Sequence, residues 1–167
     1  MPSLGASFTA ANVGGQTVVV EGVSIKGNDS SWGAAIAAAE ASDAIVLALG
    51  TDRSVASEGT DLTSISLPGV QSAFAKAVIA AAKGKPVVFL LVSSFPIAFE
   101  ELWDAVDGVV LAYTPGFGAQ KVVDALFGAN RWGRSIFTVR QHWRHCVFIY
   151  PLVAFFFYSS VPVRAHP

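Results

Sequence analysis

Three short apolar stretches decide the fold of this 167-residue chain: Ala44–Leu49 (AIVLAL), Val87–Val92 (VVFLLV) and Gly108–Ala112 (GVVLA). Each stretch is continuously apolar rather than alternating, and it is rich in aliphatic and β-branched residues. Runs of this length and kind are typical of strands buried on both faces of a parallel sheet. The sequence therefore predicts a sheet that is mostly parallel and covered on both sides.

Helical patterns separate these strands. Residues 34–41 are nearly all alanine, the strongest helix former. After Pro68, apolar residues recur at helical spacing, and we expect Pro68 to lie in the first turn and Gly84 to end that helix. Shorter helices are expected over 99–106 and 119–127. The fold class is α/β: a three-layer α/β sandwich, flavodoxin-like, with right-handed crossovers and helices on both faces.

In such sheets, ligands meet the loops at the carboxyl ends of the strands. Here those loops are Gly50–Leu67, Ser93–Ile97 and Tyr113–Gly118. The first is too long for an ordinary connection between a strand and a helix, and long loops are commonly functional. We therefore expect the functional residues on these three segments.

Composition excludes several classes of function. The chain is 53% hydrophobic and 14% charged, with a net charge of −1, which removes the electrostatic case for a nucleic-acid partner. Its single cysteine, Cys146, excludes a disulfide framework and a multi-thiolate zinc site. All three histidines lie beyond residue 141, away from the main body. The glycine motifs that cradle phosphates are absent, and so is the G-x-S-x-G of a serine hydrolase.

The carboxyl-terminal part of the chain differs in composition from the rest. Residues 1–130 have a net charge of −6, whereas residues 131–167 have a net charge of +5 and hold 9 of the 19 aromatic residues. The apolar run 146–158 is shorter than the ~20 residues of a membrane-spanning helix and is broken by Pro151, so a membrane role is not expected. We interpret 139–167 as an irregular, aromatic-rich tail unrelated to the body.

Three phrases in a fixed order carry a family resemblance. They are GTDRSVASEGTD at 50–61 with LPGVQ at 67–71, then AAKGKPVV at 81–88, then AYTPG at 112–116 with ALFG at 125–128 and GR at 133–134. In this order and spacing they resemble the C-terminal α/β sandwich domain of family 3 glycoside hydrolases, in its β-glucosidase and β-xylosidase branch. The resemblance covers roughly residues 34–138.

The resemblance implies a retaining glycosidase that uses two carboxylates about 5–5.5 Å apart. In the family the nucleophile is an aspartate on a preceding (β/α)8 barrel, and the acid/base glutamate lies on the sandwich loop. A chain of 167 residues does not also hold a barrel of ~250 residues. We therefore expect this chain alone to be inactive and to need the barrel domain, which relatives carry in cis. The implied substrate is a β-linked oligosaccharide or an aryl or alkyl glycoside, with no metal or organic cofactor.

The resemblance points to Glu58 as the acid/base candidate. Relatives often read S-V-E-A-E-G where this chain reads Ser54–Gly59 (SVASEG), so Ala56 stands in place of the first glutamate. Whether the family proton donor corresponds to position 56 or to Glu58 stays open. Asp61 matches the aspartate of the family phrase and is a second candidate, for substrate binding. The alternative is that Glu58 and Asp61 only organise a surface loop through backbone hydrogen bonds.

Aromatic residues and further carboxylates have alternative interpretations. Tyr113, at the end of a strand, is a candidate for stacking on a sugar ring. Trp103 has the same chemistry, but its position favours the core. Glu100, Glu101, Asp104 and Asp107 are expected to form a solvated face.

The domain organisation follows from the resemblance. We expect 1–30 to be a linker and first-strand remnant, with strand-like Thr17–Val20 and Val23–Ile25, and 31–138 to be the sandwich domain. These boundaries suggest a fragment of a longer hydrolase, so the compartment stays unknown, although relatives are often secreted or vacuolar. The rival hypothesis is a non-catalytic carbohydrate-binding or interaction remnant.

Overall fold

The three predicted strands form and pair in the order in which they occur. The computed structural model describes residues 3–27, 32–113, 118–128 and 147–148. Strands β1 (Ile45–Gly50), β2 (Val87–Val92) and β3 (Gly108–Ala112) are parallel, and β4 (Val147–Phe148) adds two paired positions beside β3. Two of the three predicted ranges match the observed strands residue for residue, and the third is displaced by one residue.

The strands are apolar throughout because their side chains alternate between two buried layers. In β1, the side chains of Ile45, Leu47 and Leu49 enter one core, and Ala48 enters the other. Both cores contain residues that are fully or almost fully buried. In a strand with one solvated face, apolar and polar residues would alternate. The continuous apolar runs therefore reflect the three-layer arrangement.

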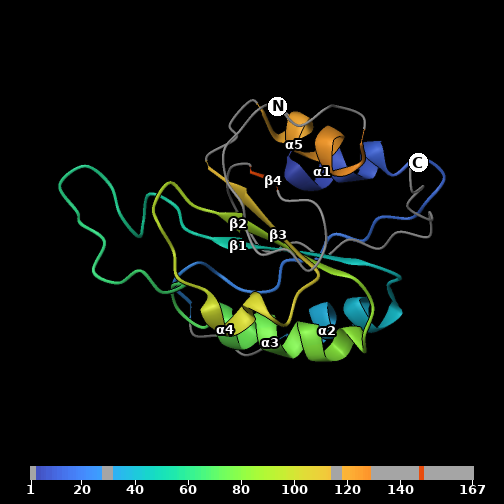
Figure 1. Ribbon diagram of the computed structural model, residues 1–167, viewed down its shortest axis with the longest axis horizontal. Helices are drawn as coiled ribbons and strands as arrows, with labels where there is room; N and C mark the ends of the chain where they lie inside the picture. The colour runs from blue at the N-terminus through green and yellow to red at the C-terminus, as the bar shows by residue number, and fades with distance from the viewer. Residues whose placement is uncertain (1–2, 28–31, 114–117, 129–146, 149–167) are drawn as a thin grey trace.

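Helices cover both faces of the sheet (Figure 1). Helices α2 (Gly33–Ala41), α3 (Gln71–Ala82) and α4 (Glu100–Trp103) lie on one face, and α1 (Leu4–Ala11) and α5 (Ala119–Leu126) lie on the other. The crossovers through α3 and α4 are on the same face, as right-handed connections between strands added in one direction require. The predicted α/β sandwich is confirmed.

The amino-terminal segment differs from the prediction. Residues 4–11 form a helix that packs with α5, and neither Thr17–Val20 nor Val23–Ile25 forms a strand. The segment instead passes from one face of the sheet to the other. Val19 lies against Gly5 of α1, whereas Gly22 lies against the ring of Phe74 in α3. Val23 of this segment is buried in the core on the α3 face and Val20 packs against that core, whereas Val19 is exposed.

Helix α3 also begins later than predicted. Pro68 precedes the helix, which starts at Gln71, and the intervening Gly69 has a φ of +58° and lies close to the carbonyl oxygen of Gly27. The expected stop is present in modified form, because Lys83 (φ 52°) and Gly84 (φ 82°) both adopt the left-handed conformation.

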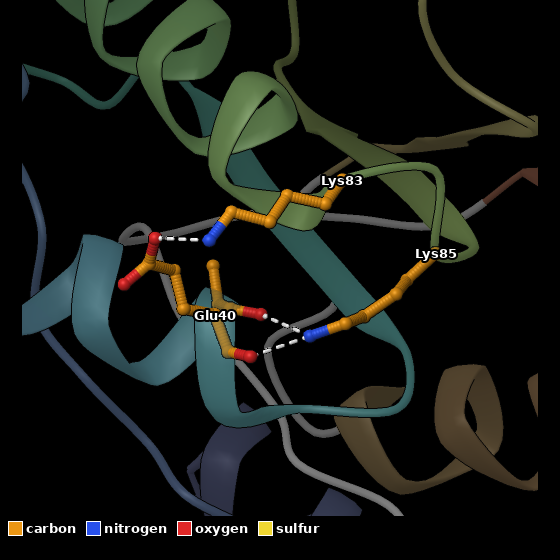
Figure 2. Close-up of polar contacts among 4 residues, drawn as sticks. Glu40, Lys83 and Lys85 are labelled. Carbon is orange, nitrogen blue, oxygen red and sulfur yellow. Dashed lines mark hydrogen bonds and ion pairs between the residues drawn. The ribbon is translucent and has the colours of Figure 1, made fainter.

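The loop after α3 holds the end of α2 (Figure 2). Lys85 Nζ donates to the carbonyl oxygens of Ala39 (3.3 Å) and Glu40 (2.5 Å) in the last turn of α2, where the Ala39 carbonyl also accepts from the Ser42 amide (3.4 Å). Lys83 Nζ lies 2.8 Å from Glu40 Oε1. The hydrogen bond and charge of Lys83 lower the pKa of the Glu40 carboxyl below its ordinary value of 4.5.

We expect Gly22→Ala to destabilise the fold, because an added Cβ would lie 2.0 Å from a ring atom of the buried Phe74. Overpacking of this kind costs about 1–3 kcal/mol, which urea unfolding would measure. Gly33→Ala is the matched control, because no atom lies within 4 Å of its added Cβ. Equal midpoints for the two variants would contradict the described path of the segment.

Glu40→Gln is expected to lower the melting temperature at pH 7 by no more than about 2 °C, because the pair with Lys83 is exposed. A lowered pKa in the folded state adds stability above pH 4.5, and that stability is lost as the pH falls through the folded value. Melting curves of the two proteins should therefore converge in acid. A difference that grows as the pH falls would contradict this sign.

Candidate functional site

The candidate site residues lie at the carboxyl ends of the strands. Residues 51–67, here named the β1 loop, project from the end of β1 well beyond the sheet (Figure 1). Residues 93–99, the β2 loop, connect β2 to α4, and Tyr113 directly follows β3. Positions 114–117 of the third predicted loop lie outside the described residues.

Both ends of the β1 loop are fixed to the neighbouring strand and loop. At its start, the Thr51 amide donates to the Val92 carbonyl (2.7 Å), and the buried hydroxyls of Thr51 and Ser93 lie 2.8 Å apart. At its end, the Ala98 amide donates to the Ile65 carbonyl (2.6 Å). The loop therefore leaves and returns at defined positions.

A buried glutamine determines the conformation where β1 passes into its loop. The Gln71 side chain accepts a hydrogen bond from the Gly50 amide (2.8 Å) and donates to the Gly50 carbonyl (2.8 Å) and the Ile25 carbonyl (3.0 Å). Gly50 is needed here, because an added Cβ would lie 1.8 Å from the Val92 carbonyl oxygen. Three backbone groups and one side chain thus satisfy each other in an almost dry environment.

The first turn of the β1 loop is held by polar contacts. Asp52 Oδ1 accepts from the amide (2.8 Å) and the hydroxyl (2.5 Å) of Ser54. Lys26 Nζ donates to the Ser54 carbonyl oxygen. Asp52 thereby performs the loop-organising role considered for Glu58 and Asp61.

Glu58 lies in a tight turn further along the β1 loop. Ser57 and Thr60 exchange two backbone hydrogen bonds of 3.0 and 2.9 Å, which leaves Glu58 and Gly59 as the central residues. The φ of Gly59 is +77°, as the third position of a type II turn requires. The turn is local, so the orientation of Glu58 depends on four consecutive residues and on the fixed ends of the loop.

Of the three carboxylates of the β1 loop, Glu58 and Asp61 are exposed. Neither Glu58 nor Asp61 makes a side-chain hydrogen bond or ion pair with any other residue that the structure describes. Ala56, in contrast, is 3% exposed. Of the two positions considered for the family proton donor, only 58 therefore presents its side chain to solvent.

The aromatic candidates have different surroundings. Tyr113 is 43% exposed at the end of β3. Trp103 packs against the core of the α3 face and lies 5.5 Å from the ring of Phe99, so the core interpretation is the correct one. Asp107 was expected to lie on a solvated face, but its carboxylate also has a structural contact. Its Oδ2 accepts a hydrogen bond from the Val87 amide (2.8 Å) at the start of β2.

Metal and membrane features can be stated for part of the chain. The described residues contain no group of three or more His, Cys, Asp or Glu side chains placed to hold a metal ion. In the same ranges, no helix has the length and apolar character needed to cross a membrane. The expected tail, apart from 147–148, lies outside the described residues.

Comparison with known proteins identifies a family and several relatives. The pattern of the glycosyl hydrolase family 3 C-terminal domain matches residues 3–153. Beta-D-xylosidase 1 of Arabidopsis thaliana is 39% identical over 118 residues, which are 69% of this chain and 15% of that protein. Beta-D-xylosidase 3 of the same plant is 33% identical over 61% of this chain and 14% of its own length. The xylan 1,4-beta-xylosidase of Xylanibacter ruminicola is 43% identical over 72 residues, 42% of this chain and 8% of that protein.

This chain therefore spans at most 15% of the length of these three relatives. The family match begins at residue 3 and so includes α1 and the segment that we predicted to be a linker.

We expect Gln71→Met to destabilise the fold by about 2–4 kcal/mol, because it leaves three backbone groups of Gly50 and Ile25 without their partner. Gln120→Met, which removes one bond to Asp124 on α5, is the matched control and should cost less than about 1 kcal/mol. Chemical unfolding of both variants measures the difference. Similar losses would show that the Gln71 contacts contribute little.

Proposed function

This chain belongs to the family of glycosyl hydrolase family 3 C-terminal domains, and from that membership we propose that its β1 loop supplies Glu58 as the acid/base of a retaining β-xylosidase. The chain is a carbohydrate-hydrolase domain by family. The three relatives described above are all named xylosidases, which favours β-linked xylosides over β-glucosides as substrates.

The observation that carries the proposal is the placement of Glu58. Its carboxyl group is exposed in a tight turn of a loop whose two ends are fixed. A general acid must come within hydrogen-bond reach of the glycosidic oxygen of a substrate held elsewhere. An unengaged carboxyl on a projecting loop meets this need, whereas the Asp52 carboxylate is already committed to Ser54.

The second carboxylate comes from outside this chain in the proposed mechanism. Glu58 protonates the leaving oxygen while a nucleophilic carboxylate on a barrel domain attacks the anomeric carbon. Glu58 then removes a proton from the water that releases the sugar. Without a domain that supplies this nucleophile, we expect no hydrolysis. Asp61, on the same loop, contacts sugar hydroxyls, and Tyr113 stacks on an apolar sugar face.

One observation favours a second function, carbohydrate binding without catalysis. Position 56, where many relatives have the first of two glutamates, is a buried alanine here. If that position supplies the family proton donor, this domain retains binding residues such as Tyr113 and Asp61 but has lost the acid. The two functions differ in one measurable property. Only a domain that supplies the acid allows a barrel to hydrolyse a substrate whose leaving group needs a proton.

We expect the full chain, fused behind a family 3 barrel that has lost its own C-terminal domain, to hydrolyse xylobiose and p-nitrophenyl β-xyloside. Glu58→Gln should lower kcat/KM for xylobiose by about 10²–10⁴-fold, because kcat/KM reports the first step, in which the leaving alkoxide needs a proton. The loss of kcat/KM with p-nitrophenyl xyloside should be much smaller, because that leaving group departs as a stable anion. The kcat values should fall for both substrates, because Glu58 also activates the water of the second step. Steady-state kinetics on the two substrates measures the difference.

Glu101→Gln is the matched carboxylate control, since Glu101 pairs with Lys76 on the helical face and is not part of the β1 loop. Equal losses of kcat/KM for both substrates in Glu58→Gln would contradict the acid/base role. An inactive fusion that still binds xylobiose would favour the non-catalytic function.

A further inference from the structure

We propose that Gln71 and Lys26 are positioning residues for Glu58, acting through the backbone of the β1 loop. This inference rests on the proposed function of Glu58. Neither residue is placed to touch substrate in this mechanism; each acts on the part of the chain that carries the acid.

Two routes lead from Gln71 to the loop. In the first, its amide holds both polar groups of Gly50, the last residue of β1, so the direction in which the chain enters the loop is set. In the second, the same amide holds the Ile25 carbonyl. The next residue in that segment, Lys26, donates to the Ser54 carbonyl oxygen, four residues before Glu58.

The second route joins residues that are far apart in the sequence, so it can fix the position of the loop relative to the helix. Lys26 and Ser54 are 28 residues apart, and Ile25 and Gln71 are 46 residues apart. The Val70 amide also donates to the Gly27 carbonyl (3.3 Å), so the segment 25–27 runs along the start of α3. The segment thereby links a rigid helix to the exposed loop.

The two residues differ in burial, and this separates positioning from stability. Gln71 is 2% exposed, and its loss affects the whole fold. Lys26 is an exposed side chain, so its replacement should leave global unfolding nearly unchanged. Lys26→Met therefore tests the position of the loop with little change in fold stability, and Gln71→Met tests both properties.

The kinetic test uses the full chain fused to a family 3 barrel, with xylobiose and p-nitrophenyl β-xyloside as substrates. A displaced general acid should lower kcat/KM for xylobiose by about 10-fold in Lys26→Met and by up to about 100-fold in Gln71→Met. The change in kcat/KM with p-nitrophenyl xyloside should stay within about 2-fold. Lys76→Met is the matched control, because this exposed lysine pairs with Glu101 on the helical face and should change neither rate.

A second readout needs no activity and uses the chain by itself. Arg53, an exposed residue, directly precedes Ser54, whose bonds to Asp52 and Lys26 should slow tryptic cleavage at this peptide bond. Lys26→Met and Gln71→Met should both speed cleavage after Arg53, followed by mass spectrometry, whereas Lys76→Met should not.

The outcomes separate the two proposals. If Glu58→Gln itself shows no dependence on the leaving group, the proposed function fails. The positioning role alone fails if Glu58→Gln shows this dependence but Lys26→Met and Gln71→Met do not. They would fail to show it either by losing the same activity on both substrates or by losing activity on neither. Unchanged cleavage after Arg53 in both variants would also overturn the positioning role.

Discussion

The burial of one side-chain amide, that of Gln71, constrains the carboxyl end of the sheet. Strand β1 lies at the edge of the described sheet, and its last residue, Gly50, directs its amide and carbonyl away from β2. These groups are buried, so leaving either of them unpaired would destabilise the fold through its lost hydrogen bonds to water. Gln71 pairs both of them and also reaches Ile25 from the start of α3. Strand, helix and amino-terminal segment are thereby joined at a single point.

This constraint explains how rigid and exposed parts coexist in the β1 loop. Its ends are held by backbone bonds to Val92 and Ala98 and by the buried hydroxyl pair of Thr51 and Ser93. Beyond Ser54, the turn around Glu58 forms its own bonds and is otherwise exposed. A carboxyl group that must meet a substrate bound on another domain needs this combination, because a free loop would lose orientation and a packed one would lose access.

The sequence was a good guide to the sheet and a poor one to the contacts that shape the site. Strands β2 and β3 were predicted to the residue, because burial on both faces leaves an unbroken apolar record. Helix α1 was missed, because residues 1–30 were interpreted together as a linker with strand-like stretches. The strand-like composition of Thr17–Val20 does not reveal that this stretch forms no strand. Gln71 stood in a quoted phrase without a role. Its partners Gly50 and Ile25 are 21 and 46 residues away, beyond any local rule.

Burial also bears on the choice that the sequence left open between positions 56 and 58. Both lie in the phrase that resembles the family, and residue type alone did not separate a lost acid from a retained one. The hydrogen bonds between Ser57 and Thr60 place residue 58 at the outer side of a turn, while Ala56 is 3% exposed. In this conformation, burial at position 56 would disfavour the charged form of a carboxyl group and raise its pKa. Position 58 carries no such cost, which supports Glu58 as the acid that this loop conformation can use.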